Sequence, residues 1–85
     1  MMQLIIRYTH QDTANFRTAF DADAEDRGRN GLSLLQLWRE DDGHSWALFQ
    51  VGDVKAAREY LSGAAKVFES QAGITATDAH FLETA

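Results

Sequence analysis

Two segments of the chain carry large apolar side chains at both odd and even positions, and this pattern restricts the fold more than any other. Residues 32–38 read LSLLQLW and residues 46–51 read WALFQV. Alternate side chains of a β-strand point to opposite faces of its sheet, so each segment predicts a strand with two apolar faces. Such a sheet needs cover on both faces, and a chain of 85 residues has few elements to provide it.

The chain predicts two further strands beside these two. Residues 2–9 roughly follow a period of two, with Leu4, Ile6 and Tyr8 on one face, and residues 74–83 form the predicted last strand. The strands at 32–40 and 45–51 are joined by DDGH, in which Asp42-Gly43 is a hairpin dipeptide. A two-residue loop pairs Asp41 with His44 and sets Leu37 opposite Leu48, whereas a three-residue loop sets Trp38 opposite Trp46. Both registers stay open at this point.

Two helices separate these strands. Asp12 or Thr13 can cap the first helix, and Asp53 can cap the second by accepting a backbone N–H. Gly28 or Gly31 stops the first helix and Gly73 stops the second as a left-handed cap. The acidic residues of the first helix predict a solvated face: Asp21, Asp23, Glu25 and Asp26.

The element order β-α-β-β-α-β predicts one ferredoxin-like α+β domain over residues 1–85. A four-stranded antiparallel sheet then has two helices on one face, and its second face stays apolar and uncovered. Uncovered apolar patches mark interfaces or ligand grooves. The sequence therefore predicts a homodimer that packs sheet against sheet.

Composition excludes several classes of function. The net charge is −5 and the eight Lys and Arg residues are scattered, so no basic surface for nucleic acid is expected. No apolar run reaches the length of a membrane span, and the N-terminus lacks a secretory pattern. We therefore expect a cytoplasmic protein that binds neither nucleic acid nor membranes. The chain has no cysteine, which rules out thiolate chemistry and disulfides.

The sequence resembles the dimeric α+β barrel superfamily over essentially its whole length. The likeness rests on the element order, on the two-faced strands, and on the segment ALFQVGDVKAAREYLSGAAKVFESQAGI. The resemblance implies a relationship to small uncharacterised members, antibiotic-biosynthesis monooxygenases, polyketide cyclases and stress-responsive barrels. Fold does not select an activity among these.

The last strand places a carboxylate and an imidazole on one face, at Asp78 and His80. A carboxylate can orient one imidazole nitrogen and leave the other to act as a base or an acid. The resemblance implies a strand histidine beside a tyrosine in an apolar pocket, which points to His80 with Tyr8. The opposing interpretation is an edge strand with a solvated face.

Three more residues are candidates for substrate binding: Trp38, Trp46 and His10. Tryptophans wall aromatic pockets in the resembling monooxygenases, but they equally fill cores and dimer contacts. His10 precedes the first helix, where a loop-facing histidine is the simpler interpretation. DDGH lacks a supporting shell for a metal, and no phosphate loop or zinc spacing is present, so neither metal nor cofactor is expected.

Two functions follow as hypotheses. The first is a cofactor-independent monooxygenase or cyclase/isomerase that acts on an aromatic or polyketide-like molecule. Its predicted catalytic residues are His80, Tyr8 and Asp78. The alternative is a non-catalytic dimeric module that binds a ligand or another protein. A pocket of ~300 Å³ or more favours the first hypothesis.

Overall fold

Four antiparallel strands form one sheet in the computed structural model, which describes all 85 residues. The strands are β1 (Met2–His10), β2 (Leu32–Asp41), β3 (His44–Val51) and β4 (Ile74–Glu83). Their spatial order is β2-β3-β1-β4, so the first strand lies in the middle and pairs with the last. This order confirms the predicted ferredoxin-like α+β fold.

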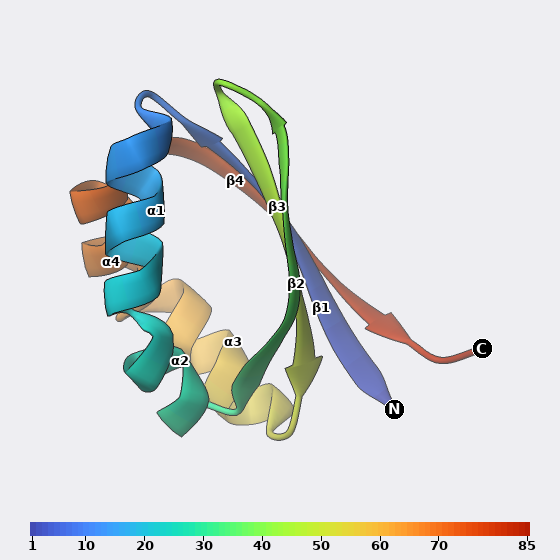
Figure 1. Cartoon of the computed structure of the whole chain (residues 1–85). Helices are drawn as coiled ribbons and strands as arrows, with labels where there is room; N and C mark the ends of the chain where they lie inside the picture. Colours follow the sequence, from blue (N-terminus) through green and yellow to red (C-terminus); the bar gives the residue numbers. More distant parts are fainter.

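Each of the two predicted helices is divided into two shorter ones. The four helices are α1 (Thr13–Ala22), α2 (Ala24–Arg29), α3 (Val54–Ser62) and α4 (Ala65–Ala72). Gly63 leaves helical geometry, with φ −125° and ψ −92°, and ends α3. All four helices lie on one side of the sheet, and the other side is bare (Figure 1). None of them is long and apolar enough to cross a membrane.

The predicted helix caps are confirmed. The Asp12 carboxylate accepts the Asn15 N–H at 2.9 Å, and the Asp53 carboxylate accepts the Ala56 N–H at 3.0 Å. Each bond satisfies a backbone donor that the first helical turn would leave free. Gly73 adopts the left-handed conformation, with φ 68°, between α4 and β4.

The core between the helices and the sheet is built around aromatic rings. Tyr8 of β1 packs against Phe16 and Phe20 of α1 and against Phe68 of α4, with ring centroids 5.3 to 6.2 Å apart. Phe16 and Phe20 also stack on each other at 5.6 Å. Aromatic contacts of this kind add about 0.5–1.5 kcal/mol per pair to the gain from burial. This cluster fixes α1 and α4 on the centre of the sheet.

One member of the acidic series, Asp23, is half-buried, contrary to the predicted solvated face. The Tyr60 hydroxyl donates to the Asp23 carboxylate, and the Arg27 guanidinium lies 3.5 Å from the same carboxylate. Arg27 is 3% exposed and stacks 3.9 Å over the Phe20 ring. Burial raises the pKa of Asp23 above its ordinary value. The cluster ties the junction of α1 and α2 to α3, so Asp23 serves packing and not solvation.

The hairpin combines features of both predicted registers. Asp41 pairs with His44, as a two-residue loop requires, yet Trp38 pairs with Trp46, as the three-residue loop predicted. The register shifts between Arg39 and Asp41, because Glu40 is an extra residue in β2. A β-bulge therefore reconciles the two alternatives.

The bare side of the sheet, here called the open face, mixes apolar and charged groups. The register places on it Ile5, Arg7, Trp38, Trp46, Leu48, Asp78, His80 and Leu82. Trp38 is 44% and Leu82 is 48% exposed. The predicted apolar second face is thus present, with a polar strip across its centre.

Gly31 offers a test of the junction between α2 and β2. Its φ of 79° disfavours any side chain, and a Cβ there would lie 2.9 Å from the Asp53 backbone nitrogen. We expect Gly31→Ala to lower the free energy of unfolding by more than ~1 kcal/mol, measured by urea denaturation.

Gly28 is the matched control, because a Cβ at this position would have nothing within 4 Å and the residue sits inside α2. Gly28→Ala should stabilise the protein by up to ~1 kcal/mol. Equal effects of the two substitutions would contradict the close approach at Gly31.

Candidate functional site

A cavity of about 350 Å³ lies between α1 and the edge of the sheet formed by β2 and β3. Its lining residues are Thr13, Phe16, Arg17, Leu37, Trp38, Arg39 and Ser45. The helices cover β1 well but leave β2 largely exposed: of its residues only Leu32 is buried. The cavity results from this incomplete cover, and it exceeds the ~300 Å³ typical of the smallest ligand sites.

A histidine and a serine form a buried pair at one wall of this cavity. His10 Nε2 lies 2.9 Å from Ser45 Oγ, and the two residues are 4% and 3% exposed. The His10 ring stacks on Phe16 at 4.6 Å with an interplanar angle of 18°. Ser45 and Phe16 both line the cavity, so His10 lies directly behind two of its wall residues.

The electrostatics of His10 keep its imidazole neutral. Burial is the main cause that lowers the pKa of His10 below its ordinary value, and nearby His44 adds to the effect. The carboxylates of Asp41 and Asp12 act in the opposite direction but less strongly. Nδ1 of His10 is buried and has no hydrogen-bond partner. A neutral, buried imidazole that contacts a hydroxyl in a cavity wall can act as an acid–base group.

The second cavity lacks such chemistry. It has a volume of about 340 Å³ and lies between α3 and β4, lined by Arg58, Leu61, Ser62, Ala79 and Phe81. The Arg58 guanidinium stacks 4.1 Å over the Phe81 ring. Its serine, Ser62, donates to the Glu59 carbonyl, whereas Ser45 of the first cavity contacts a histidine, so the first cavity is the stronger candidate.

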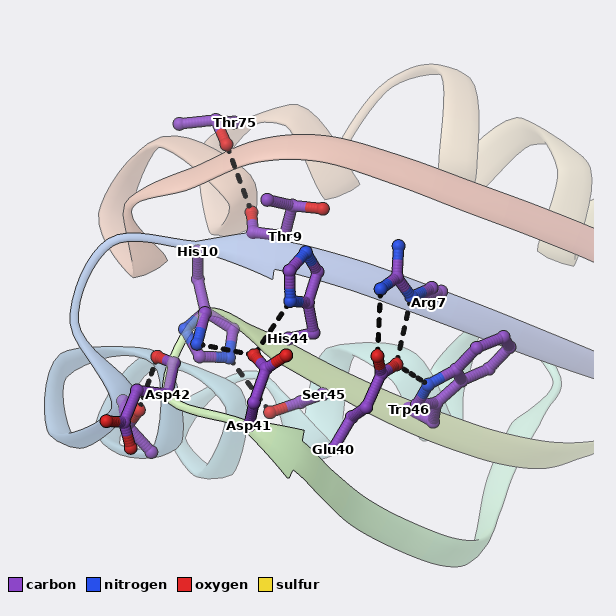
Figure 2. A network of polar contacts seen from close by, with 12 residues as sticks. Arg7, Thr9, His10, Glu40, Asp41, Asp42, His44, Ser45, Trp46 and Thr75 are labelled. Carbon is purple, nitrogen blue, oxygen red and sulfur yellow. Dashed lines mark hydrogen bonds and ion pairs between the residues drawn. The ribbon is translucent and has the colours of Figure 1, made fainter.

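The open face carries its own polar network, centred on Glu40 (Figure 2). Arg7 donates two bonds of 3.0 Å to the Glu40 carboxylate, and the Trp46 indole donates a third at 2.6 Å. These hydrogen bonds lower the pKa of Glu40, and the carboxylate raises the pKa of Arg7. Trp46 is thereby held by Glu40 and Arg7 on the open face, away from the first cavity.

Three ligand-type side chains converge at the hairpin. Atoms of Glu40, Asp41 and His44 lie within 4.8 Å of one another. Asp41 accepts from the Gly43 backbone N–H at 2.8 Å and lies 2.7 Å from His44 Nδ1, and these bonds lower the pKa of its carboxyl. The carboxylates are thus occupied by protein donors (Figure 2), and the group is explained as the tip of a hairpin.

The predicted contact between Tyr8 and His80 is wrong. Tyr8 pairs with Thr77, and His80 pairs with Ile5 three residues away along β1. Three is an odd number, so the two side chains point to opposite faces of the sheet. Tyr8 is 4% exposed in the aromatic core, and burial raises the pKa of its hydroxyl. Tyr8 is a packing residue here, without access to a cavity.

Asp78 and His80 do share one face, as predicted, and that face is the open one. Both are exposed, and neither lines a cavity. Asp78 pairs with Arg7 across β1 and β4, next to the Glu40 network. Their catalytic roles stay predictions, and enclosing them requires a partner over the open face.

The tryptophans divide between the two regions. Trp38 borders the first cavity from β2, although its pairing with Trp46 assigns its side chain to the open face. Of the predicted substrate-binding residues, the structure brings Trp38 and His10 near one cavity and leaves Trp46 outside it. Sequence reasoning missed the other six cavity residues, which are Thr13, Phe16, Arg17, Leu37, Arg39 and Ser45.

Comparison with known proteins identifies the fold class. No family model matches the chain, and no curated protein matches it. SnoaB from Streptomyces nogalater, a cofactor-independent oxygenase, superposes with a TM-score of 0.73 at 19% identity, covering 99% of this chain and 92% of SnoaB. A proposed antibiotic biosynthesis monooxygenase from Deinococcus radiodurans superposes with a TM-score of 0.70 at 14% identity, covering 100% of this chain and 93% of that protein.

The same fold also occurs in proteins of other chemistry. Acylphosphatase from Bacillus subtilis superposes with a TM-score of 0.68 at 15% identity, covering 100% of this chain and 89% of the enzyme. The chain therefore has a ferredoxin-like α+β fold, which these proteins share. At identities this low, the activity of a compared protein cannot be assigned to this chain.

The lowered pKa of His10 predicts a pH dependence of stability. Between that lowered pKa and ~6.5 the unfolded chain binds a proton at this histidine that the folded chain does not. We expect the His10 contribution to the free energy of unfolding to rise with pH through this window and to be constant above and below it. Urea denaturation between pH 5 and pH 7.5 measures the slope.

His10→Gln should remove this part of the slope, whereas the exposed His80→Gln should keep it. An unchanged slope in His10→Gln would show that the buried imidazole is not its source.

Proposed function

We propose that this protein is a cofactor-independent enzyme that abstracts a proton from an aromatic or polyketide-like carbon acid bound in the first cavity. The observation that carries the proposal is the buried His10–Ser45 pair at the wall of that cavity. Proton abstraction from carbon is the first step of oxygenation, of cyclisation and of isomerisation alike. The proposal therefore covers a monooxygenase and a cyclase/isomerase.

His10 is the general base in this proposal, and Ser45 connects it to the substrate. The substrate proton passes to Ser45 Oγ while the Ser45 proton passes to His10 Nε2, across the 2.9 Å contact. Nε2 accepts only in the tautomer that carries a proton on Nδ1. The lowered pKa of His10 supports this role, because the imidazole is unprotonated and available at neutral pH.

The cavity walls suit a flat apolar substrate. Phe16 and Leu37 line the cavity from opposite sides, on α1 and β2. SnoaB, the oxygenase of similar fold, is described as independent of a cofactor, which agrees with the predicted absence of one here.

Anthrone is a suitable probe, because it is an aromatic carbon acid. Anthrone and O₂ give anthraquinone and water: a C–H proton leaves to the base, O₂ oxidises the carbanion and forms the new C–O bond, and the second oxygen departs in water. We expect His10→Gln to lower the rate of anthraquinone formation by ~100-fold or more, since a positioned base contributes ~10²–10⁴. Absorbance and O₂ uptake measure the rate.

His80→Gln is the matched control, because His80 lies on the open face outside the cavity. The proposal expects the control to retain wild-type turnover. Loss of turnover in His80→Gln with full activity in His10→Gln would instead move the centre to the open face, where Asp78 and His80 were predicted to act. Thermal melts of both variants separate lost chemistry from lost fold.

The alternative function is a non-catalytic dimeric module, and the open face favours it. Ile5, Trp38, Leu48 and Leu82 form an apolar surface around the Glu40 network. We propose that a second copy covers this face, which makes a homodimer compatible with either function. The predicted cytoplasmic location and the roles of Asp78, His80 and Trp46 stay predictions.

Sedimentation tests the dimer. The wild type should sediment at twice the chain mass of 9.5 kDa at micromolar concentration. Leu48→Asp should shift it to the monomer, because an unpaired carboxylate in an apolar interface is costly to desolvate.

Val67→Asp is the control, since Val67 is 62% exposed on α4, in the helical layer. It should leave the dimer intact. A wild-type monomer under these conditions would refute the proposed assembly.

A further inference from the structure

The first cavity differs in charge from the rest of the molecule. The chain has 13 acidic and eight basic residues, which give it a net charge of −5. The seven residues of the cavity wall nevertheless include Arg17 and Arg39 and no acidic residue. A concave site lined by one sign of charge attracts ligands of the opposite sign.

The two arginines are not equivalent. Arg17 of α1 donates to the Asp21 carboxylate at 3.0 Å, so its charge is partly balanced within the chain. Arg39 of β2 forms no ion pair and no side-chain hydrogen bond. A guanidinium offers five donors in a planar fork, and on Arg39 all of them are free for a ligand.

The sheet register places Arg39 next to the proposed base. Arg39 pairs with Ser45 across β2 and β3, so the two side chains leave the same face. Directly opposed residues of an antiparallel pair have Cβ atoms ~4.5–5.5 Å apart. Ser45 in turn contacts His10. One ligand can therefore reach the Arg39 guanidinium and the Ser45 hydroxyl together.

We infer that the ligand of this cavity is an aromatic carboxylate, with its ring beside Phe16 and Leu37 and its anionic group on Arg39. This inference rests on the proposed function, since it names the substrate class of the same site. The Arg39–carboxylate pair is bidentate, which fixes the ring relative to Ser45. The neighbouring Arg17 strengthens the attraction at longer range.

A pair of matched probes tests the inference: 2-naphthoate, which is an anion at neutral pH, and 2-naphthamide, which is neutral and of the same shape. Isothermal titration of the wild-type protein should give a dissociation constant for 2-naphthoate that is lower than that for 2-naphthamide by about tenfold or more. The preference should shrink as salt is added, because the site is open to solvent. Equal affinities for the two probes would overturn the inference.

Arg39→Gln and Arg29→Gln separate the specific arginine from general charge. Both remove one positive charge, but Arg29 lies on α2, outside the cavity. Arg39→Gln should abolish the preference for naphthoate, and Arg29→Gln should keep it. A preference that survives Arg39→Gln would overturn the assignment of the anion to Arg39.

The outcome is distinguishable from that of the anthrone experiment. Anthrone carries no carboxylate, so its turnover reports on His10 alone. Turnover that depends on His10, together with equal affinity for both probes, retains the proposed function and rejects the aromatic acid. A naphthoate preference that depends on Arg39, without turnover, retains the ligand class and rejects the base. Failure of both probes to bind rejects the ligand class.

Discussion

The strict alternation of β1 is the constraint on which the rest of the structure depends. Leu4, Ile6, Tyr8 and His10 all point into the helical layer, and each of them is at most 4% exposed. β1 lies between β3 and β4, so its register with each strand determines which side chains of β3 and β4 point toward the helices. The aromatic cluster, the His10–Ser45 pair and the Glu40 network all follow from which side of β1 a residue occupies.

The fold could be predicted from the sequence because the residues that begin and end its helices and turn its hairpin are easy to recognise. Asp12 and Asp53 cap helices, Asp42-Gly43 turns the hairpin, and Gly73 ends the helical layer, each at the predicted place. The helix breaks at Asp23 and Gly63 were not predicted. Both sit inside otherwise helical patterns, and the backbone leaves helical geometry there, with ψ −2° at Asp23 and ψ −92° at Gly63.

The site could not be predicted to the same extent, because the sequence of β4 does not show which of its side chains point toward the helices. Its apolar residues occur at both parities, as at Phe81 and Leu82, so the face of His80 depends on pairing with β1. The sequence did contain one pattern that could have predicted the His10–Ser45 pair. Ser45 is the polar member of the inward series Ser45, Ala47, Phe49 and Val51, and a polar residue in a buried register needs a partner. His10 is that partner.

The central position of β1 has a consequence for how the chain acquires its structure. Met2 pairs with Glu83, so the last strand pairing joins residues from nearly opposite ends of the sequence. During synthesis β1 is made first and must wait for β4, and its edge is unpaired in the meantime. Pairing β1 with β4 closes a long loop, which costs more entropy and is slower than forming the local β2–β3 hairpin. The nascent chain is therefore exposed to edge-to-edge association until β4 emerges.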